Sequence, residues 1–294
     1  MRIAITGANG SIGRRLIRNL VELGEKDIVA LVRSEKSAQV ISDEGLGVDI
    51  RVVDYDDADG IREAVGRCDL IFHLAGIIKE SQANPFHKAH EGTCQALCKA
   101  DLGAKQIINL GIIGTSLSSG NACLQSRAAA ESILNSGSVC VKTLRVPMVL
   151  GEGDYSSFAL ARNARKPITL VFRAASLEQP VDCQDVITAL LSAVGLPLDS
   201  RVLELAGPES LTRAALISRA GRILGNQPRV ISIPFWVGWA LAAVIELLSA
   251  NPPITRAMLG VLDHDDEIDT CEACAILGIS LTPLDETLAR VISN

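Results

Sequence analysis

Aromatic side chains are scarce in this sequence of 294 residues. Phe, Trp and Tyr together make up 3% of it, and its two tyrosines are Tyr55 and Tyr155. Neither begins a Tyr-x-x-x-Lys motif, because the fourth residue after Tyr55 is Asp59 and the fourth after Tyr155 is Ala159. The sequence therefore excludes proton transfer by a tyrosine and a lysine that lie one helical turn apart.

An excess of basic residues is also lacking. The net charge of −6 provides no positive field that would attract a polyanion, so nucleic acid is not a predicted partner. The eight cysteines are scattered, and their one Cys-x-x-Cys motif, Cys271 to Cys274, has no second pair. A structural zinc site requires such a pair, so we predict reduced thiols and no metal.

The sequence has no apolar run long enough to span a bilayer. Its most apolar stretch, "PFWVGWALAAVIELLSA" at 234–250, continues for about a dozen residues before Glu246, where a bilayer requires roughly 20. We expect a helix buried in a C-terminal lobe. The alternative is a helix at a membrane interface, with its two tryptophans at the level of the headgroups.

The chain begins directly with the apolar segment "RIAIT", which leaves no room for a signal peptide. We therefore expect a cytoplasmic protein. The alternative is a protein that contacts the inner face of a membrane peripherally through residues 234–250.

Short apolar segments rich in Ile, Val and Leu alternate with helical patterns in the first half of the chain. The segments read as strands lie at 2–6, 27–32, 48–53, 69–75, 106–110 and 141–146. Strands of this composition are covered on both faces, and alternation with helices gives right-handed crossovers. The fold predicted is therefore α/β, a Rossmann-type doubly wound parallel sheet.

The alternation loosens after Arg145. A short strand at 201–207 and a helix at 212–224 predict a smaller C-terminal α/β lobe, with Thr212 as the N-cap and Gly225 just past the helix end. We expect a core domain at 1–150 and a lobe at 151–294 that binds a substrate or a protein partner. The two are interleaved, and their boundary is approximate.

Three glycines follow the first strand in "TGANGSIGRRL". Gly7 permits a tight turn, Gly10 lets backbone amides approach a pyrophosphate, and Gly13 lets the helix pack against the sheet. The helix N-terminus then faces the phosphates with its partial positive charge. The turn therefore predicts a dinucleotide site, which would also include Asn9, Ser11 and Ile12.

The end of the second strand indicates which dinucleotide binds. An NAD site usually has an acidic residue there, which accepts hydrogen bonds from the ribose hydroxyls. This sequence has Arg33 instead, and Arg14 follows the last glycine of the turn. Two guanidinium groups suit a 2′-phosphate, so we predict that NADP(H) is preferred over NAD(H).

These motifs, together with "VDYDD" (53–57), "FHLAG" (72–76), "LRVPMVLGEGD" (144–154) and "QPVDCQDV" (179–186), resemble the extended and atypical short-chain dehydrogenase/reductase superfamily. The chain is most similar to the subgroup that contains the NADPH-binding accessory subunit of respiratory complex I and its bacterial relatives. The resemblance implies that Asp54 contacts the adenine, with Tyr55 nearby. It also implies that the turn from His73 through Leu74, Ala75 and Gly76 lines the nicotinamide ribose.

Active members of these families place a serine after the fifth strand and a Tyr-x-x-x-Lys motif on the next helix. The corresponding positions here are Gly111, Cys123 and Arg127. A thiol beside an arginine is able to exchange a proton, but it ends several ångströms short of a phenolic oxygen. Arg127 still has donors for ribose hydroxyls. We therefore predict a cofactor contact at Arg127 and no conventional catalytic residue.

Three functions are compatible with these features. The first is a non-catalytic or weakly catalytic NADP(H)-binding protein that acts in binding or assembly. The second is an active NADP-dependent oxidoreductase, or a nucleotide-sugar epimerase or dehydratase, that uses unusual residues. The third is a membrane-associated member of the superfamily that acts on a lipid or quinone.

Overall fold

The computed structural model describes residues 1–248, 255–261 and 264–292. They divide into two compact units that interleave along the chain. The first contains residues 1–145 and 189–203, and the second contains residues 146–188 and 204–294 apart from those outside the described ranges. Whether the division at residue 150 marks domains that fold independently stays a prediction.

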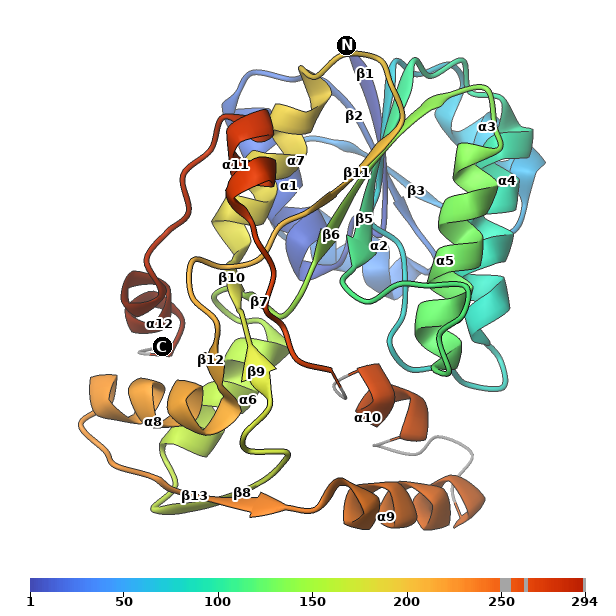
Figure 1. Ribbon diagram of the computed structural model, residues 1–294. Helices are drawn as coiled ribbons and strands as arrows, with labels where there is room; N and C mark the ends of the chain where they lie inside the picture. The colour runs from blue at the N-terminus through green and yellow to red at the C-terminus, as the bar shows by residue number, and fades with distance from the viewer. Residues whose placement is uncertain (249–254, 262–263, 293–294) are drawn as a thin grey trace. The chain divides into compact units, whose positions relative to one another are not determined.

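A seven-stranded sheet forms the centre of the first unit, in the order β11-β6-β5-β4-β1-β2-β3 (Figure 1). Its strands are β1 (Arg2–Thr6), β2 (Asp27–Val32), β3 (Asp49–Val52), β4 (Leu70–His73), β5 (Gln106–Ile112), β6 (Cys140–Val146) and β11 (Arg201–Glu204). The pairs β1–β2, β1–β4, β2–β3 and β4–β5 are parallel. The predicted Rossmann-type fold is confirmed, and the six predicted strands correspond to β1 through β6.

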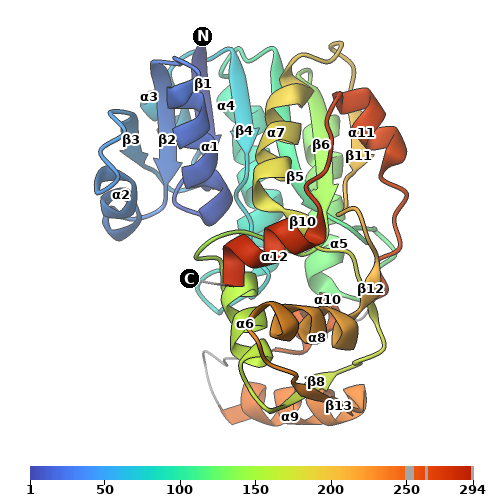
Figure 2. The same ribbon diagram turned by 90° about the vertical axis from the view of Figure 1, so that its left-hand side faces the viewer.

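Helices cover both faces of this sheet (Figures 1 and 2). On one face lie α1 (Ser11–Glu22), α2 (Glu35–Ser42) and the C-terminal half of α7 (Cys183–Val194). On the other lie α3 (Ala58–Val65), α4 (Thr93–Ala100) and α5 (Ala122–Asn135), with a π-helical turn at Lys88–Gly92 before α4. Apolar side chains such as Ile61, Leu97 and Leu134 pack from these helices against the sheet.

One predicted strand belongs to a different part of the fold from the one expected. Residues 201–207 were assigned to the C-terminal lobe, but β11 lies beside β6 at the edge of the seven-stranded sheet. An edge strand is covered incompletely, and the side chains of β11 are only half-buried or exposed. Its composition therefore did not mark it as part of the main sheet.

The second unit has its own core between α6 (Tyr155–Ala164), α8 (Arg213–Ile223) and α12 (Leu284–Ile292). Three two-stranded ladders accompany them: β7 (Val149–Leu150) with β10 (Val181–Asp182), β9 (Leu177–Glu178) with β12 (Leu211–Thr212), and β8 (Ile168–Phe172) with β13 (Arg229–Ile233). The other helices are α9 (Phe235–Leu248), α10 (Arg256–Val261) and α11 (Cys271–Leu277).

The predicted limits of the helix at 212–224 are confirmed. Thr212 is the N-cap of α8, and its hydroxyl accepts a hydrogen bond of 3.1 Å from the Ala215 amide. Gly225 follows the C-cap residue with a φ of +71°, a conformation that glycine adopts without strain.

The expectation of a buried helix at 234–250 is wrong for the described part, α9. The side chains of Trp236 and Leu247 are 72% and 86% exposed, and the buried residues of the helix are Gly238 and Ala242. The helix is apolar all round, and only a narrow stripe of it packs on the protein. No helix in the described part of the chain is long and apolar enough to cross a membrane.

A buried ammonium group joins two strands of the first unit to the end of α7. Lys142 in β6 is 2% exposed, and its Nζ donates to the Gln106 side-chain oxygen at 2.6 Å. The same Nζ donates to the carbonyls of Ala193 and Leu196 at 3.0 and 2.9 Å. Burial lowers the pKa of Lys142, but three acceptors match its three donors. The contact therefore satisfies carbonyls that the helix end would otherwise leave unpaired.

Replacing Lys142 should destabilise the first unit strongly. Lys142→Met keeps most of the apolar stem but leaves the Gln106 side-chain oxygen and the Leu196 carbonyl without their donor, which we expect to cost about 2–4 kcal/mol of unfolding free energy. Urea denaturation measures this loss. The matched control is Lys105→Met, at an exposed lysine just before β5. Equal effects of the two substitutions would contradict the assignment.

Candidate functional site

The turn between β1 and α1 brings three backbone segments together. Gly7 has a φ of +69°, and a Cβ there would lie 2.8 Å from the amide of Ala75, which follows β4. A Cβ at Gly13 would lie 2.5 Å from the Gly7 carbonyl oxygen. Larger residues at either position would push the turn away from the sheet or from α1. The structure thus places both glycines where the sequence analysis required them.

The N-terminus of α1 is open to an anion. Its N-cap residue is Gly10, which has no side chain to accept from the first amides of the helix. The Gly10 amide itself donates to the Gly7 carbonyl at 3.0 Å and closes the turn. Amides at a helix N-terminus bind phosphate through hydrogen bonds and the helix dipole.

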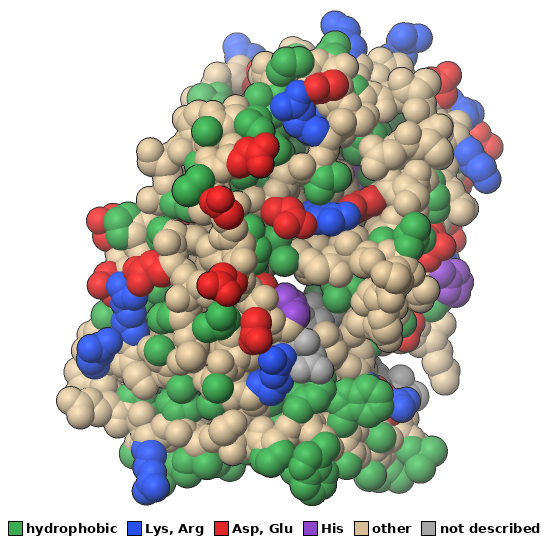
Figure 3. All heavy atoms as spheres, in the orientation of Figure 1, with side chains coloured by type: hydrophobic (Ala, Val, Ile, Leu, Met, Phe, Trp, Pro, Cys, Tyr) green, Lys and Arg blue, Asp and Glu red, His purple; other side chains and the backbone are tan. Residues whose placement is uncertain are grey.

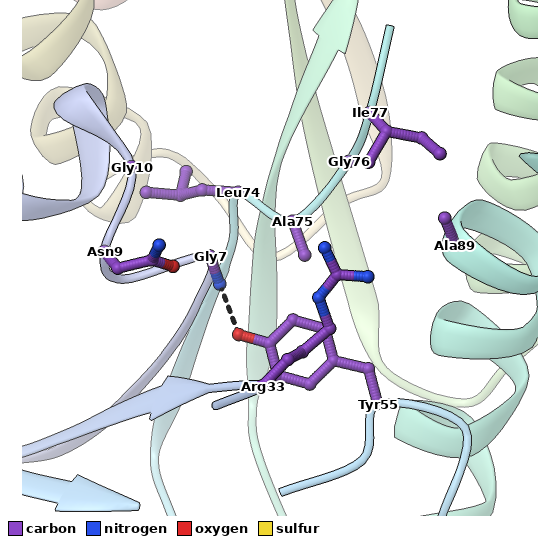
Figure 4. Close-up of a pocket in the computed structure, with 10 residues that line it drawn as sticks. All are labelled: Gly7, Asn9, Gly10, Arg33, Tyr55, Leu74, Ala75, Gly76, Ile77 and Ala89. Atoms are coloured by element: carbon purple, nitrogen blue, oxygen red, sulfur yellow. Dashed lines mark hydrogen bonds between the residues drawn. The ribbon is translucent and has the colours of Figure 1, made fainter. Parts of the chain in front are cut away.

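A cavity of about 220 Å³ lies at this turn, beside the carboxyl ends of β1, β2 and β4 (Figure 4). Its lining residues are Gly7, Asn9, Gly10, Arg33, Tyr55, Leu74, Ala75, Gly76, Ile77 and Ala89. In the sheet, β2 lies on one side of β1 and β4 lies on the other, so the direction in which successive strands are added reverses at β1. In open α/β sheets this reversal is where nucleotides bind.

Most of the predicted cofactor residues line this cavity, and some do not. Those outside its lining are Ser11, Ile12, Gly13, Arg14, Asp54 and Arg127. Two lining residues were not predicted. Ile77 directly follows the "HLAG" turn, so its place in the sequence was a signal that it lines the cavity. Ala89 belongs to the π-helical turn before α4, and nothing in the sequence indicated its approach.

Tyr55 fastens the glycine turn to the second strand. Its hydroxyl donates to the Leu31 carbonyl at 2.5 Å and accepts from the Gly7 amide at 2.8 Å, as the dashed line in Figure 4 marks for Gly7. Burial raises the pKa of Tyr55 to about 12. The phenol therefore stays neutral at physiological pH, and both of its hydrogen bonds serve the backbone of the site.

The two arginines predicted to bind a 2′-phosphate have different surroundings. The Arg33 guanidinium lies over the Tyr55 ring, 5.9 Å from its centroid, and donates to the Asn84 side-chain oxygen at 3.1 Å. Arg14 instead forms an ion pair of 2.8 Å with Glu44. Glu44 also binds Arg18, and these contacts, the Arg18 hydrogen bond first, lower the pKa of Glu44. Only Arg33 lines the cavity.

The side chain of Asp54 is 65% exposed and lies apart from the cavity lining. A hydrogen bond with the Asp56 carboxyl raises the pKa of Asp54, and burial adds to this effect. Lys88 forms an ion pair of 3.0 Å with Asp56 and lies 3.9 Å from Asp54. The adenine contact implied for Asp54 stays a prediction.

Cys123, at the position of the family tyrosine, is completely buried in the first turn of α5. Its thiol donates to the Ile77 carbonyl across 3.5 Å. Burial raises the pKa of the Cys123 thiol, and the opposing effect of Arg127 is smaller. The thiol is therefore protonated and engaged with the backbone, and it does not line the cavity.

Arg127, one turn later, lies against Gly76. A Cβ on Gly76 would collide with the guanidinium, so glycine at this position makes room for it. The Nη1 group is 3.4 Å from the Leu110 carbonyl, and Nε has no hydrogen-bond partner among the described residues. Burial lowers the pKa of this guanidinium. The guanidinium thus lies beside Gly76, one of the residues that line the cavity.

Gly111, at the position of the family serine, is enclosed by an ion pair. Arg145 and Glu131 form a salt bridge of 2.6 Å. A Cβ on Gly111 would lie 2.8 Å from a Glu131 carboxylate oxygen and 2.9 Å from the Arg145 side chain. A serine cannot be accommodated there unless this ion pair moves.

Two neutral histidines lie beside Arg127. The His73 ring is 2.8 Å from the Thr6 hydroxyl, and the His90 ring is 3.0 Å from the Ile77 carbonyl. Burial, and then the charge of Arg127, lowers the pKa of each histidine to about 3. Among the described residues, no group of three or more His, Cys, Asp or Glu side chains could hold a metal ion.

A glycine turn, an open helix N-terminus and a cavity at the reversal of the sheet define a nucleotide-binding Rossmann domain. Residues 7–139 match the model of a family described as NAD(P)H-binding. The match supports a nicotinamide dinucleotide as the cofactor of this domain, and the predicted resemblance to the short-chain dehydrogenase/reductase superfamily is confirmed.

Two characterised relatives share 25% identity with this chain. Subunit 9 of the mitochondrial NADH dehydrogenase (ubiquinone) 1 alpha subcomplex from Arabidopsis thaliana matches over 259 residues, 85% of this chain and 64% of the relative. The chain thus spans less than two thirds of that subunit. A ceramide reductase from Caulobacter vibrioides matches over 236 residues, 79% of this chain and 73% of the enzyme.

Solved structures of low sequence identity share the fold. A triphenylmethane reductase from Citrobacter sp. superposes with a TM-score of 0.77 at 19% identity, over 100% of both chains. A UDP-glucuronic acid 4-epimerase from Bacillus cereus, in complex with NAD, superposes with a TM-score of 0.75 at 16% identity, over 100% of this chain and 98% of the epimerase. These likenesses show the architecture alone.

The buried histidines should make the stability of the protein depend on pH. Each has a pKa near 3 when folded and about 6.5 when unfolded, so the unfolded state binds more protons between these values. The free energy of unfolding should therefore decrease as the pH falls from about 6.5 towards 3. Each histidine contributes a slope of about 1.4 kcal/mol per pH unit.

The test is urea denaturation at several pH values between about 6 and 4. His73→Gln should reduce the slope by about 1.4 kcal/mol per pH unit relative to the original protein, and His90→Gln should do the same. Because each variant is compared with the original protein at the same pH, the contribution of carboxylates that titrate in this range to the unfolding free energy cancels. Parallel slopes for the variants and the original protein would show that these histidines are not buried in the neutral form.

Proposed function

We propose that this chain is an NADP(H)-binding protein that does not carry out the usual hydride-transfer cycle of its superfamily. The observation that carries this proposal is the state of the two proton-transfer positions. The Cys123 thiol is buried, protonated and bonded to the Ile77 carbonyl. Gly111 is enclosed by the ion pair between Glu131 and Arg145. Neither position offers a group that could exchange a proton with a substrate in the cavity.

The remaining residues suit cofactor binding. The amides at the start of α1 would hold the pyrophosphate, and Gly7 and Gly10 allow it to approach the backbone. Arg33 would hold the 2′-phosphate, and the ring of Tyr55 beneath it limits the movement of its guanidinium. When bound, the dinucleotide supplies a nicotinamide able to donate or accept hydride. In this proposal the nicotinamide has no side chain beside it that transfers a proton to or from a substrate.

Arg127 has a binding function in this proposal. It replaces the lysine that holds the nicotinamide ribose in the families that this chain resembles, and hydrogen bonds to hydroxyls require only donors. Its Nε has no hydrogen-bond partner among the described residues, and its guanidinium lies beside Gly76 of the cavity lining, which supports such a contact. A cofactor held in this way would stabilise the fold by mass action.

The likeness to a complex I subunit supports a role in assembly with a protein partner, which the second unit would bind. The alternative is an active reductase of a long-chain lipid, and the likeness to a ceramide reductase favours it. The two functions differ in turnover. An assembly protein retains NADPH without consuming it, whereas a reductase oxidises NADPH when a lipid ketone is supplied.

Arg33 should determine the preference for the phosphorylated cofactor. We expect the original protein to bind NADPH more tightly than NADH, and Arg33→Ala to weaken NADPH binding about 10- to 100-fold through the loss of charge-assisted hydrogen bonds. NADH binding should change by less than about threefold. Isothermal titration calorimetry measures both affinities.

Two matched variants sharpen this experiment. Arg14→Ala should weaken NADPH binding less than Arg33→Ala, because the guanidinium of Arg14 is paired with Glu44. Arg51→Ala, at an exposed arginine of β3, controls for the loss of a positive charge. Equal affinity of the original protein for the two cofactors would refute the NADP(H) preference. A larger loss with Arg14→Ala would reverse the roles of the two arginines.

Cys123 should be dispensable for every property of the site. Cys123→Ala removes a buried thiol that is not positioned for proton transfer, so NADPH binding should be unchanged within about twofold. Oxidation of NADPH, followed by its absorbance with ketones, nucleotide sugars and lipid ketones as substrates, should stay at background for both proteins. Gln125→Ala, at an exposed position of the same helix, is the control. Turnover by the original protein that is lost in Cys123→Ala would establish an active enzyme.

A further inference from the structure

The second unit exposes a continuous apolar surface formed by β8, β13 and α9. We call it the apolar platform. It includes Leu170 and Ile231 from the strands, and Trp236, Trp239, Val244 and Leu247 from the helix. Figure 3 shows hydrophobic side chains gathered along the lower edge of the molecule, where Figure 1 places these elements. Exposed apolar patches of this kind mark surfaces that bind a partner or a membrane.

The strands contribute one complete face to the platform. Ile231 pairs with Leu170 in the β8–β13 ladder, so their side chains lie next to each other on the same side. The side chains of Leu170 and Ile168 are 60% and 53% exposed, whereas the alternate residues Thr169 and Val171 are buried. The buried face packs on the core of the unit, and on the apolar outer face the side chains of Ile168, Leu170 and Ile231 are exposed.

Helix α9 continues this surface. A Cβ on Gly238 would touch the ring of Phe172 in β8, so the helix packs closely against the end of that strand. The opposite side of the helix presents Trp236, Val244 and Leu247 to the solvent. A water-facing helix normally has charged residues on this side. The sequence has none there, so the helix requires an apolar environment on two sides.

The segments that form the platform contain few acidic residues. No acidic residue occurs between Pro228 and Ile245 or between Lys166 and Phe172. The one acidic residue of α9, Glu246, forms a salt bridge of 2.7 Å with Arg256, whose guanidinium lies over the Trp239 ring. A surface of this composition complements a negatively charged one.

Two cations lie at the start of the platform strands. Lys166 precedes β8, and Arg229 begins β13 opposite Ile168. Both side chains are exposed, and neither has an ion-pair partner among the described residues. A second copy of the same platform would bring no free carboxylate to them. Anionic lipid headgroups would neutralise both, and acyl chains would cover the apolar side chains.

We propose that the apolar platform binds the surface of a bilayer containing anionic phospholipid, with α9 lying in the plane of the interface. The described part of α9 has 14 residues, fewer than the roughly 20 that a helix needs to cross a bilayer. The tryptophans take the position that such side chains prefer, at the level of the headgroups. This inference is independent of the proposed cofactor function, because it rests on residues of the second unit alone.

Flotation with vesicles tests the proposal. The full chain should float with phosphatidylcholine vesicles that contain about one third phosphatidylglycerol, and more weakly with phosphatidylcholine alone. Trp236→Gln combined with Leu247→Gln should weaken binding about 10- to 100-fold, because two buried apolar contacts are lost. Lys166→Gln combined with Arg229→Gln should weaken it by about tenfold, and only on the anionic vesicles.

The matched control is Leu23→Gln, at an equally exposed leucine just after α1 in the first unit, and it should float like the original protein. NADPH binding by every variant verifies its folding separately. Failure of the original protein to float with either vesicle would overturn the proposal. So would a stable dimer, seen by sedimentation equilibrium, that the Trp236 and Leu247 substitutions dissociate. The occupant of the platform would then be a second copy.

Discussion

The close approach of backbone segments at Gly7 is the constraint on which the site depends. The turn after β1, the segment after β4 and the first turn of α1 meet without room for a side chain at Gly7 or Gly13. Tyr55 holds this arrangement from the other side by hydrogen bonds to Gly7 and Leu31. The helix dipole and the cavity depend on these contacts, since α1 and much of the cavity lining belong to the three segments. Arg33 follows β2, which Tyr55 joins to Gly7 through its hydrogen bond to Leu31.

The residues at the positions that correspond to the catalytic groups of the resembling families depend on one another. Arg127 fits because residue 76 is a glycine, and the ion pair between Glu131 and Arg145 fits because residue 111 is a glycine. The charge of Arg127 in turn helps to keep His73 and His90 neutral. A single reversion to serine, tyrosine or lysine would therefore meet a surrounding structure that has adapted to the replacement. The region is a packed cluster of polar side chains that contact one another.

Local features of the sequence were sufficient to predict the main sheet and the dinucleotide turn. Strands such as β1 and β2 are recognisable because both of their faces are buried, and a glycine turn has a fixed spacing. Contacts between distant residues were not predictable in this way. Glu44 binds Arg14 from 30 residues away along the chain. The composition of α9 does not show whether another part of the protein packs over it. Its apolar residues indicated a buried helix, and this prediction was wrong.

The hydrogen bond between Arg33 and Asn84 connects the cavity to a segment far along the chain. Asn84 belongs to a small turn in which its amide and carbonyl both pair with Ser81. This hydrogen bond orients the guanidinium before a ligand binds, so binding incurs less of the entropic cost of ordering this side chain. Linkage makes this relation reciprocal. If the proposed 2′-phosphate binds at Arg33, unfolding of the Ser81–Asn84 turn would weaken its binding, and the bound phosphate would protect the turn. Amide hydrogen exchange at this segment would then report the occupancy of the cavity.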